Sequence, residues 1–330
     1  MSDGALNAAS AAPMVRLRAR MFQSGTARRR IVLGIRALTI AAIAVFALTT
    51  PGFTSPLSIN ALLNAISFIG CVAVGMTFIT LTGNIMSLCL GATLSASALV
   101  FLASLSAGIL PAFLLTLLFG IVVTAAQGVL IGYFRANPIL VSIAGLSLLI
   151  GGAELVTGGV RIYPGGEGLQ VFKGRIAGIP VETLYFFATV VVGQFILSWT
   201  RIGRAMTMVG SNARAATAAG ISTAGAVTFA YVLAGACAAI SGILLAARYG
   251  SGDMELGTGY DYTAIAAVLV GGTAIQGGSG SVVRTLIGVT VIAIIEVVLL
   301  LRGFSQQLQY LITGIIVLSV IMLHTIGERR

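Results

Sequence analysis

The sequence predicts an all-α polytopic membrane protein with about ten transmembrane helices, and two observations support this prediction. Apolar residues make up 58% of the 330 residues and charged residues only 8%, whereas about a quarter of the residues in soluble domains are charged. The mean hydropathy is +1.05. Apolar runs of about 20 residues also recur along the chain, and each is long enough to cross roughly 30 Å of hydrocarbon. The sequence does not show the alternating polarity of a transmembrane β-barrel.

The expected spans follow one another with short polar connections. They cover residues 31–50, 57–81, 87–107, 110–132, 138–157, 182–199, 224–247, 262–276, 284–301 and 308–325. The eighth is short and flanked by glycine, so a re-entrant or broken helix remains an alternative to a full crossing there. The first 30 residues are polar and rich in arginine, and no A-x-A-type cleavage site follows them. We interpret the first span as a retained anchor and not as a signal peptide.

The distribution of charge sets the predicted orientation, because Lys and Arg are in excess in cytoplasmic loops. Ten spans with the N-terminus inside place seven loop and C-terminal arginines on that side: Arg135, Arg201, Arg204, Arg214, Arg284, Arg329 and Arg330. The acidic residues Glu167, Glu182, Asp253, Glu255 and Asp261 then fall outside. Nine spans would put the C-terminal arginines outside, so we prefer ten, with both termini cytoplasmic.

The chain then divides into a basic cytoplasmic tail (1–30), one transmembrane domain (31–325) and a short cytoplasmic C-terminus (326–330). The formal net charge of +10 is explained by topology, and we expect the tail to contact anionic lipid headgroups and not nucleic acid.

No catalytic, metal or cofactor site is expected. The three cysteines, Cys71, Cys89 and Cys237, lie within predicted spans and lack the spacing of metal ligands. His324, at the end of the last span, is expected to be structural. The glycine-rich run 271–281 lacks the Lys-Ser/Thr ending with which a P-loop holds phosphates and magnesium. We therefore expect neither an enzyme nor an ATP site in this chain.

A weak internal symmetry predicts an inverted-topology repeat. Around residues 75–94 an apolar helix leads through a glycine-containing turn into another helix, and residues 265–288 repeat this order. If the first span is an addition, spans 2–5 and 7–10 form matched sets of opposite direction. In transporters, glycine-interrupted segments at matched positions point to the substrate path. Gly271, Gly272 and Thr273 are therefore pathway candidates.

One polar segment, residues 201–221, interrupts the apolar chain and contains three arginines. Asn212 is a favourable N-cap because its side chain accepts from free backbone N–H groups. The alanine-rich run after it favours helix, and Gly220 tolerates the positive φ of a helix end. We predict a helix of about two turns, roughly 10 Å long, which needs outside support to be stable. From the residues alone, a docking element and an ordinary interfacial helix remain equally open.

Short motifs occur in a specific order between residues 57 and 325. The polar segment contributes Gly203, Arg204, Gly210, Ser211, Asn212, Ala215, Ala216, Gly220 and Ile221. Other motifs lie at residues 137–139, 242–248, 257–260, 264–268, 271–273 and 277–281, and at Gly288. Together they resemble the permease subunits of ribose-type (monosaccharide) ABC importers, in the superfamily that includes branched-chain amino-acid permeases. The polar segment is similar to the cytoplasmic coupling loop of that family.

The resemblance implies a transport subunit in a bacterial inner membrane. A second permease chain, identical or paralogous, would complete the pathway, cytoplasmic ATPase subunits would dock on the coupling loops, and a periplasmic binding protein would deliver a monosaccharide or related polyol. The coupling residues that it implies are Gly203, Arg204, Gly210, Asn212, Arg214, Ala215, Ala216 and Gly220, with Gly203 and Arg204 in a turn beside the helix. An amino-acid or nucleoside permease of the same superfamily remains an alternative.

The chain departs from the family pattern at two places. Relatives usually have an acidic residue after the second span, whereas residues 83–91 contain no carboxylate and have one extra residue, near Met86 and Ser87. Relatives also often have glutamates after the coupling-loop asparagine, where this chain has Ala213 and Arg214. The helix therefore lacks the acids that favour a helix N-terminus. We predict a cognate ATPase with an acidic or neutral docking groove.

Polar residues inside spans are functional candidates, because they are costly in hydrocarbon. The pathway candidates of this kind are Asn64, Asn84, Gln127, Gln194 and Glu296. For each, an interhelical hydrogen bond without substrate contact is the alternative. A self-contained secondary transporter with Glu296 as its coupling carboxylate is the runner-up function. Outside, loops 158–181 and 249–261 are candidate contacts for the binding protein.

Overall fold

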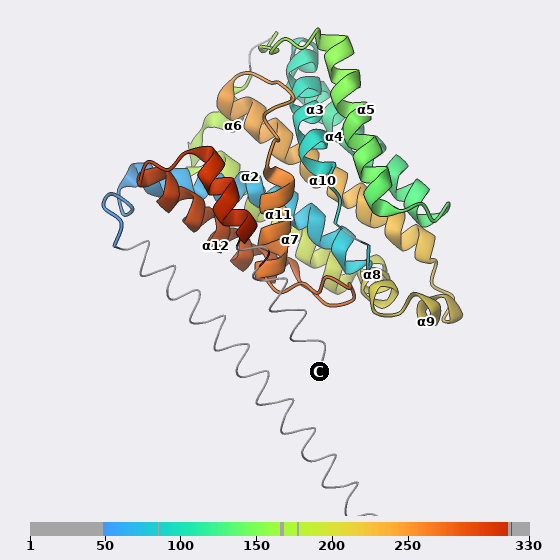
Figure 1. Cartoon of the computed structure of the whole chain (residues 1–330). Helices are drawn as coiled ribbons and strands as arrows, with labels where there is room; N and C mark the ends of the chain where they lie inside the picture. Colours follow the sequence, from blue (N-terminus) through green and yellow to red (C-terminus); the bar gives the residue numbers. More distant parts are fainter. Residues whose placement is uncertain (1–48, 85, 166–167, 177, 316–317, 319–330) are drawn as a thin grey trace, which may run out of the picture. The chain divides into compact units, whose positions relative to one another are not determined.

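The computed structural model describes residues 49–84, 86–165, 168–176, 178–315 and 318. Internal contacts divide the chain after Pro51, and the helices and strands of the described residues lie in the second unit, from Gly52 on. Seven helices within the described residues are long and apolar enough to cross a membrane (Figure 1). These are α2 (Pro56–Leu81), α3 with the 3₁₀ turn η1 (Leu90–Ser104 and Leu105–Ala107), α4 (Ile109–Gly132), α5 (Pro138–Thr157), α7 (Val181–Trp199), α10 (Thr223–Tyr249) and α12 (Val282–Leu301).

Shorter elements complete the described part of the chain. They are α6 (Gln170–Lys173), α8 (Arg201–Ser211), α9 (Ala213–Ala218), α11 (Tyr260–Val270) and an antiparallel strand pair, β1 (Arg175–Ile176) and β2 (Ile179–Pro180). Residues 306–315, in the region of the last predicted span, are also helical. The first predicted span lies almost wholly outside the described residues, as does the end of the last.

Six predicted spans agree with a helix to within two residues at each end, because local capping signals define those ends. Ser55 accepts a hydrogen bond from Ser58 N at the start of α2, and Asn137 accepts one from Ile139 N at the start of α5. Ser222 caps α10 through Gly225 N, and Gly250 ends α10 in the left-handed region. Side-chain N-caps and C-terminal glycines of this kind are readable from sequence.

Two predicted spans are wrong at one end. The third was expected from residue 87, but α3 begins only at Leu90, after a non-helical segment. The eighth was expected to reach residue 276, but α11 ends at Val270. There, Gly272 has φ +86° and donates to Leu269 O, while Thr273 N donates to Val268 O, which is a Schellman ending. With 11 residues, α11 is only about 16 Å long.

Helix α10 is the centre of the bundle, because α2, α3 and α4 all pack against it. Glycine residues make its contact with α4. A Cβ on Gly235 of α10 would overlap the carbonyl oxygen of Gly120 in α4, and a Cβ on Gly128 would lie 2.8 Å from Tyr231 Cβ. Small residues allow such close approach where lipid supplies no hydrophobic drive between helices.

Helices α2 and α3 also approach α10 closely at glycine residues. A Cβ on Gly75 of α2 would lie 3.0 Å from Ala234 Cα, and one on Gly242 of α10 would overlap the carbonyl oxygen of Leu94 in α3. Ser241 of α10 also donates to Phe68 O of α2 at 2.9 Å. The backbone of α10 is thus held close to three helices at once.

These contacts also show which loops share an end of the bundle. Helices α2 and α4 run antiparallel to α10, since Ser241 meets Phe68 and the end of α4, Gly132, meets Ala224. We call one end the coupling end, which holds residues 82–84, 133–137, 200–222 and 271–281. The opposite end holds residues 105–108, 158–165, 168–176, 178–180 and 250–256. This sidedness is the alternation that the predicted topology requires, while the end that faces the cytoplasm stays a prediction.

Prediction on packing: Gly235→Ala should destabilise the protein by about 1–3 kcal/mol, because the new methyl group overlaps the α4 backbone. Gly151→Ala in α5 is the matched control, because no atom lies within 4 Å of its added Cβ. There the better helix propensity of alanine should give a neutral or slightly positive effect of up to about 1 kcal/mol. Thermal unfolding of the purified protein measures both, and an equal response would contradict the proposed close packing.

Candidate functional site

The polar segment 201–221 forms two consecutive helices, α8 and α9, and not one. The predicted turn at Gly203 and Arg204 is wrong, because both residues lie in the first turn of α8. Thr200 Oγ1 accepts from Gly203 N at 3.1 Å and so caps this helix. Gly203 itself has no room for a side chain against the backbone of Leu197 at the end of α7. A tertiary contact therefore requires this glycine.

The predicted helix after Asn212 is confirmed. Asn212 Oδ1 accepts from Ala215 N at 3.0 Å. Gly220 has φ +79° and donates to Thr217 O, and Ile221 N donates to Ala216 O. These two hydrogen bonds make a full Schellman ending. Local residue choice thus determines both ends of α9.

Helix α8 is tied to two other elements at the coupling end. A Cβ on Gly210 would overlap the carbonyl oxygen of Leu81, the last residue of α2. Gly278, in the loop after α11, donates its N–H to the same oxygen at 3.0 Å. Ser211 Oγ donates to Gly278 O at 3.4 Å. Helix α8 is therefore in direct contact with the end of α2 and with the 271–281 loop.

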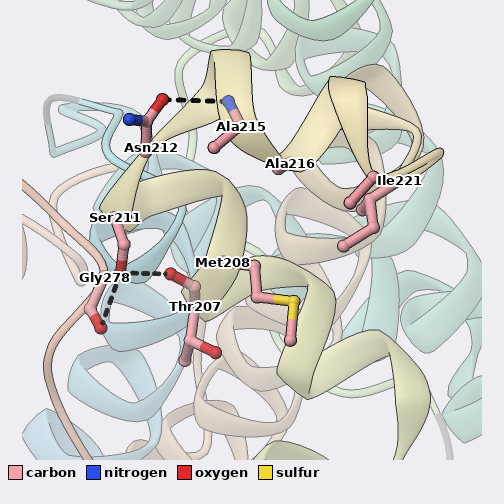
Figure 2. Close-up of a pocket in the computed structure, with 9 residues that line it drawn as sticks. Thr207, Met208, Ser211, Asn212, Ala215, Ala216, Ile221 and Gly278 are labelled. Carbon is pink, nitrogen blue, oxygen red and sulfur yellow. Dashed lines mark hydrogen bonds between the residues drawn. The ribbon is translucent and has the colours of Figure 1, made fainter.

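A groove of about 360 Å³ lies between α8 and α9 (Figure 2). It is lined by Thr207, Met208, Ser211, Asn212, Ala215, Ala216, Ala219, Ile221 and Gly278. Figure 2 shows Ser211, Asn212 and Gly278 along one side of it and Ile221 at the other. Arg204 and Arg214 are exposed nearby and form no ion pair with any residue in the described ranges. The groove thus combines an apolar lining with basic surroundings.

The structure gives several pathway candidates a structural contact. Gln194 Oε1 accepts from Ser281 Oγ at 3.1 Å and from Val283 N at 3.3 Å, so this residue of α7 caps α12 from outside. Asn84 Nδ2 donates to Thr82 Oγ1 at 2.8 Å. Gly271, Gly272 and Thr273 form the end of α11 at the coupling end.

The remaining candidates are not brought together. Glu296 is half-buried on α12, and Asn64 lies near the start of α2 with its Oδ1 buried and unpartnered among the described residues. Gln127 on α4 donates through Nε2 to Cys89 Sγ at 3.3 Å. Cys89 precedes the first residue of α3, so only Gln127 reaches a helix end inside the bundle.

Sequence analysis missed the role of Asp261, which we grouped with the outer acids. Its Oδ1 accepts from Gly91 N in the first turn of α3 at 2.8 Å, while Asp261 itself lies in the first turn of α11. Ser87 Oγ accepts from Cys89 N at 3.3 Å. The segment 83–91 lacks the expected carboxylate, and a carboxylate from another helix caps α3 here. The absence of an acid from this segment was the sequence signal that another part of the chain could supply the carboxylate.

The two outer loops proposed as contacts for a binding protein form one platform. Ile162 and Gly252 exchange two backbone hydrogen bonds of 2.8 Å. Arg161 forms a salt bridge of 2.6 Å with Asp253. Asp253 Oδ1 also accepts from Glu255 N and Leu256 N, each at 3.0 Å. We call residues 160–163 and 250–256 the outer platform.

The seven helices of the described residues that are long and apolar enough to cross a membrane define a polytopic membrane protein. The chain belongs to the family described as branched-chain amino acid transport system / permease component, which matches residues 58–321.

Similar proteins include the ribose import permease protein RbsC of Bacillus subtilis, 33% identical over 288 residues that cover 84% of this chain and 88% of the relative. The inner membrane ABC transporter permease protein YjfF of Escherichia coli is 32% identical over 255 residues, 74% of this chain and 76% of the relative. The autoinducer 2 import system permease protein LsrD of Yersinia enterocolitica is 29% identical over 311 residues, 90% and 92% of the two chains. No solved structure shows a significant match.

Prediction on α9: Asn212→Ala should weaken this helix by about 1 kcal/mol, because the Ala215 N–H loses its acceptor. Asn212→Asp, which keeps an acceptor, is the control. Hydrogen exchange should become faster over Ala213–Ala218 in the alanine variant alone. Unchanged exchange in that variant would show that the cap does not stabilise α9.

Prediction on the outer platform: Asp253→Ala should raise hydrogen exchange over residues 250–259 more than Arg161→Ala does. The arginine variant loses only a partly exposed ion pair, worth about 0–1 kcal/mol. The aspartate variant also leaves the N–H groups of Glu255 and Leu256 without their acceptor. Equal effects of the two variants would contradict this assignment.

Proposed function

We propose that this chain is a permease subunit of a binding-protein-dependent ABC importer for a monosaccharide or related polyol. The observation that supports this most directly is the α8–α9 groove, whose glycine contacts tie it to two transmembrane elements. The similarity to ribose import permeases over most of both chains supports the substrate class.

The coupling mechanism that we propose is mechanical. Cytoplasmic ATPase subunits would dock in the groove, and their closure on ATP would displace α8 and α9. Because Gly210 abuts Leu81 and Ser211 contacts Gly278, the displacement would reach α2 and the loop after α11. No step of this mechanism requires chemistry in the permease.

The remaining parts of the assembly follow from the same proposal. A second permease chain, identical or paralogous, would complete the pathway in a bacterial inner membrane. A periplasmic binding protein would dock on the outer platform, whose charged residues would make the encounter sensitive to salt. The basic N-terminal tail would contact membrane lipids.

We also propose ten spans with an inverted repeat of spans 2–5 and 7–10. In this repeat α2, α3 and α4 correspond to α10, α11 and α12, and the packing partners support it. Helix α4 packs on α10 and its counterpart α12 packs on α2, while α3 packs on α4 and its counterpart α11 packs on α12. Helices α2 and α10 run in opposite directions, as matched members of such a repeat should.

The ABC assignment and the ion-coupled alternative can be separated in proteoliposomes. We expect co-purification with an ATPase and a binding protein, and uptake only with both and ATP. Uptake by the permease alone, driven by a proton gradient, would overturn the proposal and favour the secondary transporter based on Glu296. The ligand that co-purifies with the binding protein would identify the substrate.

Prediction on docking: Arg214→Glu should weaken ATPase binding to the permease several-fold, because the groove would face an acidic or neutral partner surface. Arg135→Glu is the control, since it makes the same charge change in another exposed loop at the coupling end. Co-purification yield and ATPase affinity at several salt concentrations measure the effect. Unchanged docking of the Arg214 variant would contradict the predicted complementarity.

A further inference from the structure

Helix α3 begins inside the bundle and not at its surface. Its N-cap residue, Cys89, accepts a hydrogen bond from Gln127 of α4. The next residue of α4, Gly128, packs against Tyr231 of α10. Tyr231 lies eight residues after the start of α10, about 12 Å along that helix. The first turn of α3, which carries a partial positive charge, therefore lies well inside the bundle. At the same level, α10 is a continuous helix.

Two polar atoms have no partner among the described residues, one in Gln127, which is hydrogen-bonded to Cys89, and one in Tyr231, which interacts electrostatically with Cys89. They are Gln127 Oε1 and the Tyr231 hydroxyl, and both side chains are buried, at 5% and 0% exposure. A buried polar group without a hydrogen bond costs several kcal/mol in a medium without water. Such groups are retained where something else satisfies them, which is a water molecule or a ligand.

Helix α5 lies between Gln127 and an exposed surface. A Cβ on Gly145 of α5 would lie 2.9 Å from Gln127 Nε2 and 3.1 Å from Cys89 Sγ. Helix α5 lies alongside α3 and α4 (Figure 1), and Ser142 is its one fully buried residue. Ser142 and Gly145 share a face, so α5 covers the polar groups with one narrow stripe and exposes the rest of its surface.

We propose that Gln127 and Tyr231, at the start of α3, form a hydroxyl-binding station on the translocation pathway, which α5 covers in this structure. The proposal rests on the proposed function and deepens it. Gln127 Oε1 accepts a hydrogen bond, and the Tyr231 hydroxyl both donates and accepts. The nearby carboxylate of Asp261 is already engaged with Gly91 N. This donor and acceptor set suits a neutral polyhydroxylated molecule better than a zwitterionic amino acid, which needs paired charges.

The station is connected to the coupling end through α11. At one end of α11, Asp261 holds the first turn of α3. At the other, the loop after α11 contacts Leu81 and Ser211 through Gly278. A displacement of α8 would thus move the helix that positions α3, and this provides a route by which ATPase closure could open the station.

The native cysteines provide a test with internal controls. All three are buried and free, but Cys89 alone lies at the station. The test uses three variants, each of which retains one cysteine and has alanine at the other two positions. Each variant would be assembled with ATPase and binding protein in proteoliposomes. They would be exposed to a charged methanethiosulfonate reagent with and without ATP. We expect Cys89 to react roughly tenfold faster during ATP turnover, while Cys71 and Cys237 stay unreactive.

If Cys89 reacts no faster during turnover in a complex that hydrolyses ATP and transports, the station does not open and the proposal is overturned. If the permease forms no complex with the ATPase, or transports without it, the proposed function fails instead. The two failures are therefore distinguishable.

A second variant separates a ligand from a structural water. Tyr231→Phe keeps the ring and removes the unpartnered hydroxyl. We expect the thermal midpoint to stay or rise, while maximal uptake of the transported member of a ribose, glucose and ribitol panel falls several-fold. A lowered midpoint with unchanged uptake would show that the hydroxyl holds only an internal water, and would overturn the proposal.

Discussion

The close approach of the α10 backbone to three other helices is the constraint on which the rest of the structure depends. Gly235, Gly242 and the facing Gly75 remove the side chains that would separate α10 from α4, α3 and α2. In lipid, helices gain little from burying apolar surface, so packing at this distance supplies much of the association energy. The position of α10 then sets the depth at which α3 can begin.

Helices α3 and α11 depend on this frame for their placement. The N-cap residue of α3, Cys89, is hydrogen-bonded to Gln127 of α4, and α11 starts where Asp261 can reach Gly91. Non-helical backbone at this depth is tolerated only where protein groups or a polar cavity satisfy it. The hydrogen bonds from Gly91 to Asp261 and from Gly257 N to Ser95 Oγ meet that requirement. They also join the two helix ends into one unit.

The features predicted correctly are those governed by neighbouring residues. Asn212 and Gly220 define α9 through hydrogen bonds within four or five residues, and Pro138 follows a capping Asn137 at the start of α5. The differences have other causes. Gly203 was expected in a turn, yet it lies in the first turn of α8, where Thr200 caps the helix and contact with α7 leaves no room for a side chain. Gln194 stays a pathway candidate, and its partner Ser281 lies almost ninety residues further along the chain.

The sequence by itself determined the class of protein, most helix ends and the helix after Asn212, because hydropathy, capping and glycine at positive φ act over a few residues. Only the tertiary structure decided that Asp261 caps α3, that the two outer loops form one platform, and that Gln127 Oε1 and the Tyr231 hydroxyl are buried without a partner among the described residues. These juxtapositions depend on which backbones can approach one another. That distance is set by pairs of small residues far apart in sequence, and composition cannot reveal which glycine faces which.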